Sequence, residues 1–402
     1  MLSLKTLYWI WMSMAIGQGS GKFNDILELF GSAEEFYKAS KKELAQARIF
    51  NSSSIEKIKS VSLDSAKKAA ESAQRDGQRI LCYDDEKYPS LFRNIFCPPA
   101  VLYIKGNLPD MDNEVGVTIV GSRKCSSYGY EAAQLLSYRL AMAGAVIVSG
   151  GALGIDTAAH RGCLDAGGTT VAVLPCGIDV HYNMTNAELR KEITSSGALV
   201  SEYPAGTPVW RYSFHARNRL LAALSRGTVV IEAGEKSGAL ITANHAAEQG
   251  KDIFALPGNL KSPYSVGTNR LIKDGAYSVE CPLDVLEQYA PFYPHKLNLD
   301  GADQPLFAGT AIAPQPKKQK PTPKPQRVPS QKQEEKIERK LPDGLSDDAR
   351  LVAESLRQLP LNTDDITLAT GIATGRILRA LTELELFDVV ESLPGSRYIL
   401  KR

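Results

Sequence analysis

The first 75 residues carry apolar side chains at the spacing of short helices. The clearest series is Leu4, Leu7, Tyr8, Trp11 and Ala15; because it recurs every three or four positions, it predicts a helix. A Gly-rich turn at residues 16–21 separates this series from the next amphipathic segment. The pattern predicts a small helical domain over residues 1–75, of the SAM or helix-hairpin-helix type. Its turn either presents backbone N–H groups to a phosphate or only packs tightly, and the sequence leaves both open.

Residues 116–290 alternate short apolar runs with segments of helical periodicity. The predicted strands are residues 117–120, 146–149, 170–174, 199–201, 228–231 and 253–256, and the predicted helices are residues 131–143, 155–166, 186–196, 217–224 and 240–249. Strands that are apolar on both faces and alternate with helices are typical of a parallel sheet covered on both sides. The pattern therefore predicts an α/β domain with a Rossmann-like, doubly wound parallel sheet. Residues 76–115 are expected to connect it to the helical domain, and their apolar run at residues 101–104 is a candidate edge strand of the sheet.

The last hundred residues change character twice. Residues 301–340 interleave prolines with lysines, which predicts an extended linker without a core of its own. Three helical segments and two short apolar runs follow over residues 343–402, and this order is typical of a winged helix. Its presumed recognition helix carries Arg376 and Arg379 against two glutamates, so we expect a protein-contact or regulatory role rather than binding of duplex DNA.

Composition and charge narrow the class of protein. The chain is 43% hydrophobic and 23% charged with a net charge of +2, so any attraction to nucleic acid must come from a local patch. Six widely spaced cysteines without a C-x-x-C pair argue against a zinc ribbon, a thioredoxin motif or a disulfide scaffold, and suggest reduced thiols in a cytoplasmic protein. The apolar run at residues 7–12 is too short for a membrane span, and we interpret it as part of the first helix.

Two Gly-rich loops follow the first two predicted strands of the α/β domain, where ligands bind in such folds. The first contains Gly121-Ser122-Arg123 and the second contains Gly150-Gly151, and either loop can present amides and a guanidinium to a phosphate. Neither matches the dinucleotide G-x-G-x-x-G pattern, and each alone is also explained as a tight turn. Asp156 is expected to cap the following helix, and His160 to make a hydrogen bond on its surface.

Aromatic residues interleaved with arginines occupy residues 210–219. Rings that stack on bases beside guanidinium groups that hold phosphates are typical of sites for single-stranded nucleic acid. We expect Phe214, between Arg211 and Arg217, to take part in such a site, and Trp210 to plug the core instead. A fourth loop places Ser237-Gly238 and then Thr242 at another strand end.

Taken together, these motifs resemble the DNA-processing protein A (DprA/Smf) family. They are Gly121-Ser122-Arg123, Ser149-Gly150-Gly151-Ala152 with Asp156 and His160, Ser201-Glu202-Tyr203-Pro204, Phe214 with Arg217-Asn218-Arg219, Ser237-Gly238 with Leu240-Ile241-Thr242-Ala243, and Gly267-Thr268-Asn269. The resemblance implies a homodimer that binds single-stranded DNA and helps load RecA onto it, chiefly during natural transformation. It also implies that Arg211, Phe214, Arg217 and Asn218 join the first loop in a basic pocket. His215-Ala216 departs from the family's usual apolar residues.

The predicted DNA-binding residues are Gly121, Ser122, Arg123, Gly150, Gly151, Arg211, Phe214, Arg217, Asn218, Ser237, Gly238 and Thr242. No catalytic residue, metal ligand or cofactor is predicted. One rival is an enzyme similar to the nucleotide phosphoribohydrolases, which share the Rossmann-like fold. Against it, Pro257-Gly258-Asn259 lacks the second glycine and the following glutamate of their P-G-G-x-G-T-x-x-E motif. The other rival is a duplex-DNA regulator, disfavoured by the weakly basic last domain.

Overall fold

The computed structural model describes residues 3–180, 182, 187–307, 342, 345–356, 361–387, 389–393 and 397–400. The chain divides into two compact units, residues 1–313 and 314–402. The predicted helical domain and the predicted Rossmann-like domain thus lie in one unit. From residue 308 onward the predicted linker falls outside the described residues, as does the Pro394-Gly395 turn of the last domain.

Six short helices form the helical region at the N-terminus: α1 (Leu4–Ile16), α2 (Phe23–Phe30), α3 (Ala33–Lys38), α4 (Lys41–Gln46), α5 (Ser52–Ser60) and α6 (Leu63–Arg75). Most of them begin at a Ser or Asn whose side chain accepts a backbone N–H of the first turn, which explains how such short helices start where they do. Trp11, Phe23 and Phe36 fill their shared core. The Trp11 indole N–H donates to the Val61 carbonyl at 2.8 Å, so this large ring is buried with its polar group satisfied.

A nine-stranded sheet forms the centre of the first unit. Its strands are β1 (Arg79–Cys82), β2 (Val101–Gly106), β3 (Gly116–Val120), β4 (Val146–Ser149), β5 (Thr170–Leu174), β6 (Ala198–Ser201), β7 (Gly227–Val230), β8 (Asp252–Ala255) and β9 (Tyr277–Ser278). Their order is β1-β2-β6-β5-β4-β3-β7-β8-β9, parallel from β6 to β9 and antiparallel at β1 and β2. The segment expected to connect two domains therefore adds two strands to this sheet, together with α7 (Ser90–Arg93).

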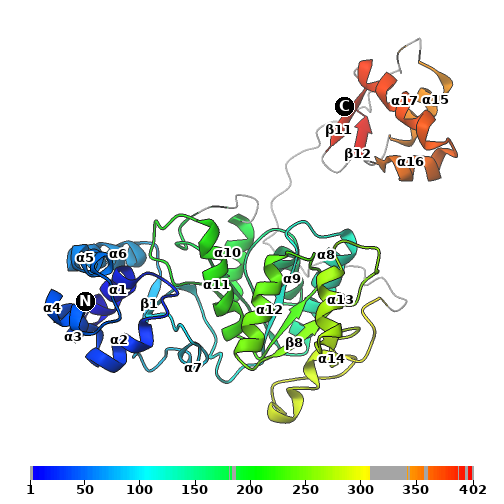
Figure 1. The fold of residues 1–402 in the computed structure, drawn as a ribbon. Coiled ribbons are helices and arrows are strands. Elements are labelled where there is room, and N and C mark those ends of the chain that lie inside the picture. Colours follow the sequence, from blue (N-terminus) through cyan, green and yellow to red (C-terminus); the bar gives the residue numbers. More distant parts are fainter. Residues whose placement is uncertain are drawn as a thin grey trace, which may run out of the picture. The chain divides into compact units, whose positions relative to one another are not determined.

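Helices cover both faces of the sheet (Figure 1). One face packs against α8 (Ser127–Met142), α9 (Ile155–Asp165), α10 (Ala187–Ser196) and α14 (Leu283–Leu286), and the other against α11 (Arg211–Ala223), α12 (Gly238–Glu248) and α13 (Val266–Lys273). The chain runs outward from β3 to β6 and then returns to start again at β7, beside β3. The switch point of this doubly wound fold, where a ligand crevice forms, therefore lies between the carboxyl ends of β3 and β7.

The second unit is a small winged helix. It contains α15 (Asp347–Ser355), β10 (Leu361–Asn362), α16 (Thr363–Thr370), α17 (Thr374–Leu386), β11 (Val390–Leu393) and β12 (Arg397–Leu400), with strand order β10-β12-β11. Val352, Ile366 and Leu381 are buried in its core. Arg376 on α17 forms an ion pair with Asp348, with 2.6 Å between Nη2 and Oδ1. One of the two basic groups of the presumed recognition helix is thus already paired within the unit.

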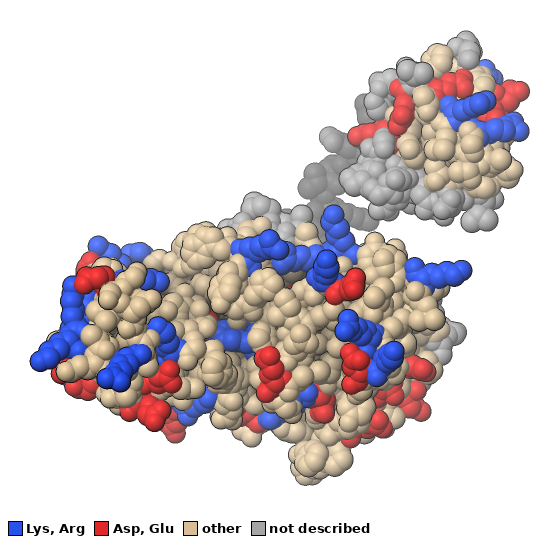
Figure 2. All heavy atoms as spheres, viewed as in Figure 1, with Lys and Arg blue, Asp and Glu red and all other residues tan. Residues whose placement is uncertain are grey.

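Charge is distributed over the surface without a dominant sign. Lys and Arg side chains intermingle with Asp and Glu side chains on the face shown in Figure 2, as the net charge of +2 leads one to expect. None of the helices in the described part of the chain is long and apolar enough to cross a membrane. Because the two signs of charge are mixed, a basic binding site has to come from a few loops rather than from a whole face of the molecule.

Candidate nucleic-acid interface

A cavity of about 680 Å³ opens at the switch point of the sheet. The loops after β3, β4 and β7 line it together with the first turns of α11 and α12. Ten of the twelve predicted site residues line this cavity: Gly121, Ser122, Arg123, Arg211, Phe214, Arg217, Asn218, Ser237, Gly238 and Thr242. Segments more than a hundred residues apart in the chain are thus brought together around one opening.

Close contacts between the loops hold this rim in place. Gly154 has a φ of +78°, and a Cβ there would lie 2.4 Å from the Ser122 carbonyl oxygen, so only glycine lets the loop after β4 approach the loop after β3. On the other side, the Ser122 N–H donates to the Glu232 carbonyl at 2.8 Å. The buried Glu232 carboxylate in turn accepts the Ser126 N–H at 2.8 Å. The backbone groups around the cavity are therefore positioned before any ligand arrives.

The cavity is lined by exposed cationic side chains and one aromatic ring, Phe214. The Arg123 guanidinium lies 4.2 Å from the centre of the Phe214 ring, a cation–π contact, and the Tyr182 ring meets Phe214 edge-on at 5.9 Å. Arg211 is exposed at the first position of α11. Lys124 and Lys236 are exposed as well, although the sequence analysis did not name them as site residues. The sequence could have indicated both lysines, because each is the direct neighbour of a predicted site residue in a loop at a strand end.

Arg217 is placed differently from the expectation. It is buried beneath the cavity, and its Nη1 donates to the Gly150 carbonyl at 2.8 Å and also to the Val173 carbonyl. A Cβ at Gly150 would lie 2.4 Å from this Nη1 atom, so Gly150 serves the site by admitting the guanidinium. Gly150 and Gly151 do not line the cavity themselves. This geometry favours a positioning role for Arg217, joining the strand ends, over the direct phosphate contact expected from the sequence.

Two expectations about α9 differ from what the structure shows. Asp156 does not cap the helix, which begins after Gly154 without a side-chain cap; it is buried and accepts the Ala152 N–H at 3.3 Å. Burial raises the pKa of this carboxyl, against the opposing attraction of Arg217. His160 is not on the surface, because it is fully buried and its Nδ1 lies 2.8 Å from the Thr170 hydroxyl. Burial lowers the pKa of His160 to about 3, so the ring is neutral.

The aromatic–arginine segment also differs from its expected form. Helix α11 begins at Arg211, six residues before the predicted start, so Phe214 lies in its first turn. Trp210 does not plug the core: its side chain is 56% exposed, just outside the helix. The tryptophans that do fill a core are Trp9 and Trp11 of the helical region. The sequence pattern did not distinguish the exposed Trp210 from the buried tryptophans. A ring just before a helix start has few neighbours on its own helix, so its burial depends on what packs against it from elsewhere.

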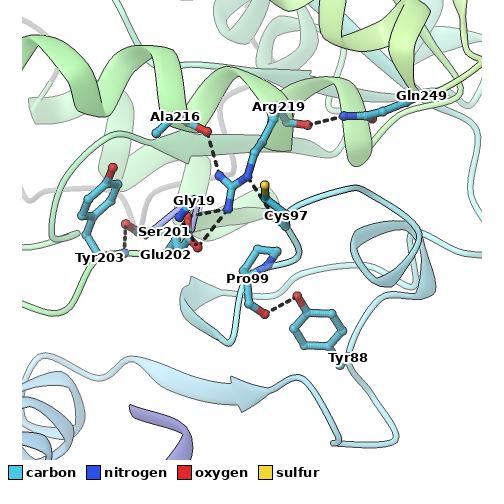
Figure 3. Close-up of polar contacts among 10 residues, drawn as sticks. All are labelled: Gly19, Tyr88, Cys97, Pro99, Ser201, Glu202, Tyr203, Ala216, Arg219 and Gln249. Atoms are coloured by element: carbon cyan, nitrogen blue, oxygen red, sulfur yellow. Dashed lines mark hydrogen bonds and ion pairs between the residues drawn. The ribbon is translucent and has the colours of Figure 1, made fainter. Parts of the chain in front are cut away.

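The side of α11 that faces the helical region holds a buried ion pair (Figure 3). Arg219 Nη2 lies 2.9 and 2.8 Å from the two carboxylate oxygens of Glu202. The other guanidinium nitrogens of Arg219 donate to backbone carbonyls: Nε to Cys97 at 2.9 Å and Nη1 to Ala216 at 2.7 Å. The Gly19 N–H of the Gly-rich turn donates to the same carboxylate at 3.2 Å. Of the two roles considered for that turn, this contact favours packing. Sequence reasoning did not foresee that this pair would join two of the motifs.

Comparisons with known proteins agree on one family. A family model described as DNA recombination-mediator protein A matches residues 79–290, and one described as the DprA winged helix domain matches residues 336–396. The chain is 32% identical over 404 residues to protein Smf of Synechocystis sp., with 99% of each chain covered. It is 42% identical over 205 residues to DNA processing protein DprA of Streptococcus pneumoniae, covering 51% of this chain and 72% of that protein. The X-ray structure of the S. pneumoniae protein superimposes with a TM-score of 0.61 at 32% identity, covering 70% of this chain and 98% of that chain.

Proposed function

This chain belongs to the DNA recombination-mediator protein A (DprA/Smf) family, and from that premise we propose that it binds single-stranded DNA in the cavity between β3 and β7. The observation that carries the proposal is the composition of the lining. Four exposed cationic side chains, Arg123, Lys124, Arg211 and Lys236, line the cavity together with one aromatic ring, Phe214, over which Arg123 lies. Asp156 is the one acid among the described lining residues, and it is buried.

In this proposal the lining residues divide into three roles. The four exposed cations neutralise phosphates, and the Phe214 ring stacks on a base once a base displaces the guanidinium that covers it. Backbone amides and hydroxyls of the rim give additional hydrogen bonds, from Gly121, Ser237, Gly238 and Thr242, whereas Ser122 shapes the loop because its N–H and hydroxyl already donate to the Glu232 and Lys124 carbonyls. Arg217 and Asn218 position the rim rather than touch DNA, since Arg217 is bonded to carbonyls and the Asn218 Nδ2 donates to the Gly238 carbonyl at 3.2 Å.

An unpaired strand fits this cavity better than a duplex does. An aromatic ring inside a concave site reaches a base only if the base is unstacked and turned outward, which a single strand permits at little cost. The cavity also recognises no particular base through an array of side-chain amides, so we expect binding that tolerates any sequence. The family resemblance supports the same choice of ligand.

Three finer points belong to the same proposal. We infer that the protein acts as a homodimer, that RecA is its partner on the bound strand, and that it works in the cytoplasm. The homodimer and RecA rest on the family resemblance, and the cytoplasm rests on the six cysteines without a C-x-x-C pair. Sedimentation of the purified protein should show a dimer, and RecA filaments should form faster on single strands that carry the protein. A strictly monomeric protein without effect on RecA would remove this part of the proposal while leaving DNA binding intact.

We further propose that the site binds without catalysis. The Asp156 carboxylate accepts a loop amide and is attracted by Arg217, and the Glu232 carboxylate is held by Ser126, so both acids have structural partners. A nucleotide hydrolase needs an acid or base within reach of its substrate. Incubation with nucleoside monophosphates should accordingly release no base. Turnover that disappears in Asp156→Asn would instead favour the phosphoribohydrolase alternative.

The test of the main proposal is a titration with matched single- and double-stranded oligonucleotides over a series of salt concentrations. We expect tighter binding to the single strand and a clear salt dependence, since phosphate neutralisation releases counterions. Binding should weaken in Arg123→Ala and remain unchanged in Lys42→Ala, a control for an exposed lysine on α4. Equal affinity for both ligands, or an unaffected Arg123→Ala protein, would contradict the assignment.

A further inference from the structure

Two large aromatic side chains are exposed beside the cavity, outside its lining. The Trp210 side chain is 56% exposed and the Tyr212 side chain is 72% exposed. Arg211, the residue between them, lines the cavity. Both rings therefore adjoin, along the chain, a residue that lines the cavity, and they lie at the amino end of α11.

Their exposure follows from where α11 begins. Trp210 precedes the helix, and its backbone N–H donates to the Ser213 hydroxyl at 3.2 Å, which fixes the start of α11. The helix becomes buried from Ser213 and Arg217 onward, so its first residues project beyond the packed layer. Among the described residues, no aromatic ring and no cation stacks on either Trp210 or Tyr212, whereas Trp9 and Trp11 have ring partners in the core.

Single exposed apolar residues are common on protein surfaces and carry no message by themselves. The informative feature here is the alternation Trp210-Arg211-Tyr212, with an exposed ring on each side of a cation that already lines the cavity. A single-stranded polynucleotide alternates in the same way between apolar bases and charged phosphates. The amino end of α11, thirteen residues long, adds a favourable field for a phosphate at this place.

We propose that Trp210 and Tyr212 form a second stacking platform, which holds bases of the same strand after that strand leaves the cavity. This inference rests on the proposed function, because it extends the path of the bound strand. It predicts a binding site longer than the cavity, in which Phe214 holds one base inside and the platform holds bases outside. Stacking on one ring strengthens binding by about 5- to 150-fold per base.

Trp210 gives the platform a direct spectroscopic reporter. It is the exposed tryptophan among the chain's three, since Trp9 and Trp11 are 4% and 1% exposed. A base stacked on Trp210 should therefore quench the exposed part of the tryptophan fluorescence. The protein is titrated with oligothymidylates of about 4 and about 16 nucleotides, lengths that span the usual site sizes of single-strand binders, and fluorescence and affinity are followed together.

We expect the long oligonucleotide to quench the fluorescence. Trp210→Ala and Tyr212→Ala should each weaken binding of the long oligonucleotide by 5-fold or more, within the range for one stacked base, and should leave its salt dependence unchanged. Trp210→Phe should lose the quenching and keep the affinity, because a ring remains. Phe292→Ala is the matched control, because Phe292 is 78% exposed. It follows Tyr289 by three residues, and the Tyr289 hydroxyl donates to Asp252 at the amino end of β8, which is the end of the strand away from the cavity.

The outcomes separate this inference from the proposed function. If the wild-type protein binds the long oligonucleotide but shows no quenching, and Trp210→Ala binds as tightly, the platform is refuted and the cavity proposal stands. If Phe292→Ala weakens binding as much as Trp210→Ala, the platform is again refuted. If the wild-type protein binds no single strand at all, both proposals fall together.

Discussion

The two sides of helix α11 use arginine in opposite ways. At the cavity, Arg211 is exposed, and Arg123, from the loop after β3, is exposed as well and lies over the face of Phe214. On the side toward the helical region, Arg219 is buried, with its guanidinium bonded to Glu202 and to two backbone carbonyls. The same residue type is thus exposed at the proposed DNA site on one side and a buried structural tie on the other.

Burial accounts for this difference. A guanidinium removed from water must have its donors and its charge satisfied within the protein, so a buried arginine has little left to offer a ligand. Arg217 follows the same rule in part: its Nη1 is bonded to the carbonyls of two strand ends, whereas its buried Nε has no hydrogen-bond partner among the described residues. The comparison teaches that DNA affinity should respond to the exposed arginines, and stability to the buried ones.

The largest effect is expected at the buried pair. Arg219→Ala leaves the Glu202 carboxylate buried without its partner, and should lower the free energy of unfolding by about 3–5 kcal/mol. Denaturant unfolding measures this change, with Arg211→Ala as the exposed control on the same helix. A combined replacement of Glu202 and Arg219 by leucine and methionine should recover most of the stability. Equal stability of Arg219→Ala and Arg211→Ala would break the comparison.

Phe214 tests the cavity side of the helix. Phe214→Ala should weaken single-strand binding by about 1–3 kcal/mol with an unchanged salt slope, because stacking releases no counterions. Stability should change little. Since Arg123 lies over this ring, the losses in Phe214→Ala, Arg123→Ala and the double variant should not be additive. A salt slope that falls in Phe214→Ala would argue against stacking.

His160 sharpens the comparison through pH. Its pKa is about 3 in the folded protein because of burial, against an ordinary value of 6.5. The unfolded chain therefore takes up a proton that the folded protein excludes, and this contribution lowers stability by about 1.4 kcal/mol per pH unit as pH falls from 6.5 toward 3. Above pH 6.5 it vanishes. Unfolding curves between these values should be less pH-dependent in His160→Gln, and an identical pH dependence would contradict the buried neutral ring.

The smallest effect is expected from single exposed cations. Arg211→Ala and Arg123→Ala should each reduce the slope of log affinity against log salt by about 0.7, the value for one phosphate of a single strand. Arg211→Lys should keep the slope because it keeps the charge. Arg217→Ala, by contrast, should lower stability first, since it leaves strand-end carbonyls and Asp156 without their partner. A loss of slope in Arg217→Ala at unchanged stability would show that the buried arginine reaches the phosphate after all.

The sequence by itself determined the architecture and which loops meet at the cavity. The predicted apolar runs between residues 117 and 256 correspond to strands β3 to β8. Strands of a parallel sheet are covered by helices on both faces, so their sequences are apolar throughout and can be recognised from the pattern. Parallel strands end at one edge of a sheet, so the loops after them were expected to meet, and ten of the twelve predicted residues line one cavity. Strands β1 and β2 were harder to foresee, because β1 pairs with β2 and β2 joins the sheet through β6, a partner about a hundred residues away.

Only the tertiary structure decided which side chains are available to a ligand. Arg211, Arg217 and Arg219 lie within nine residues of one helix, but at about 100° of rotation per residue they face different neighbours. Arg219 meets Glu202 and, beside it, the Gly19 amide from the far end of the sequence. Trp210 stays exposed because the helix starts one residue after it. Exposure depends on what packs against each side chain, and that is set by long-range contacts which no local pattern contains.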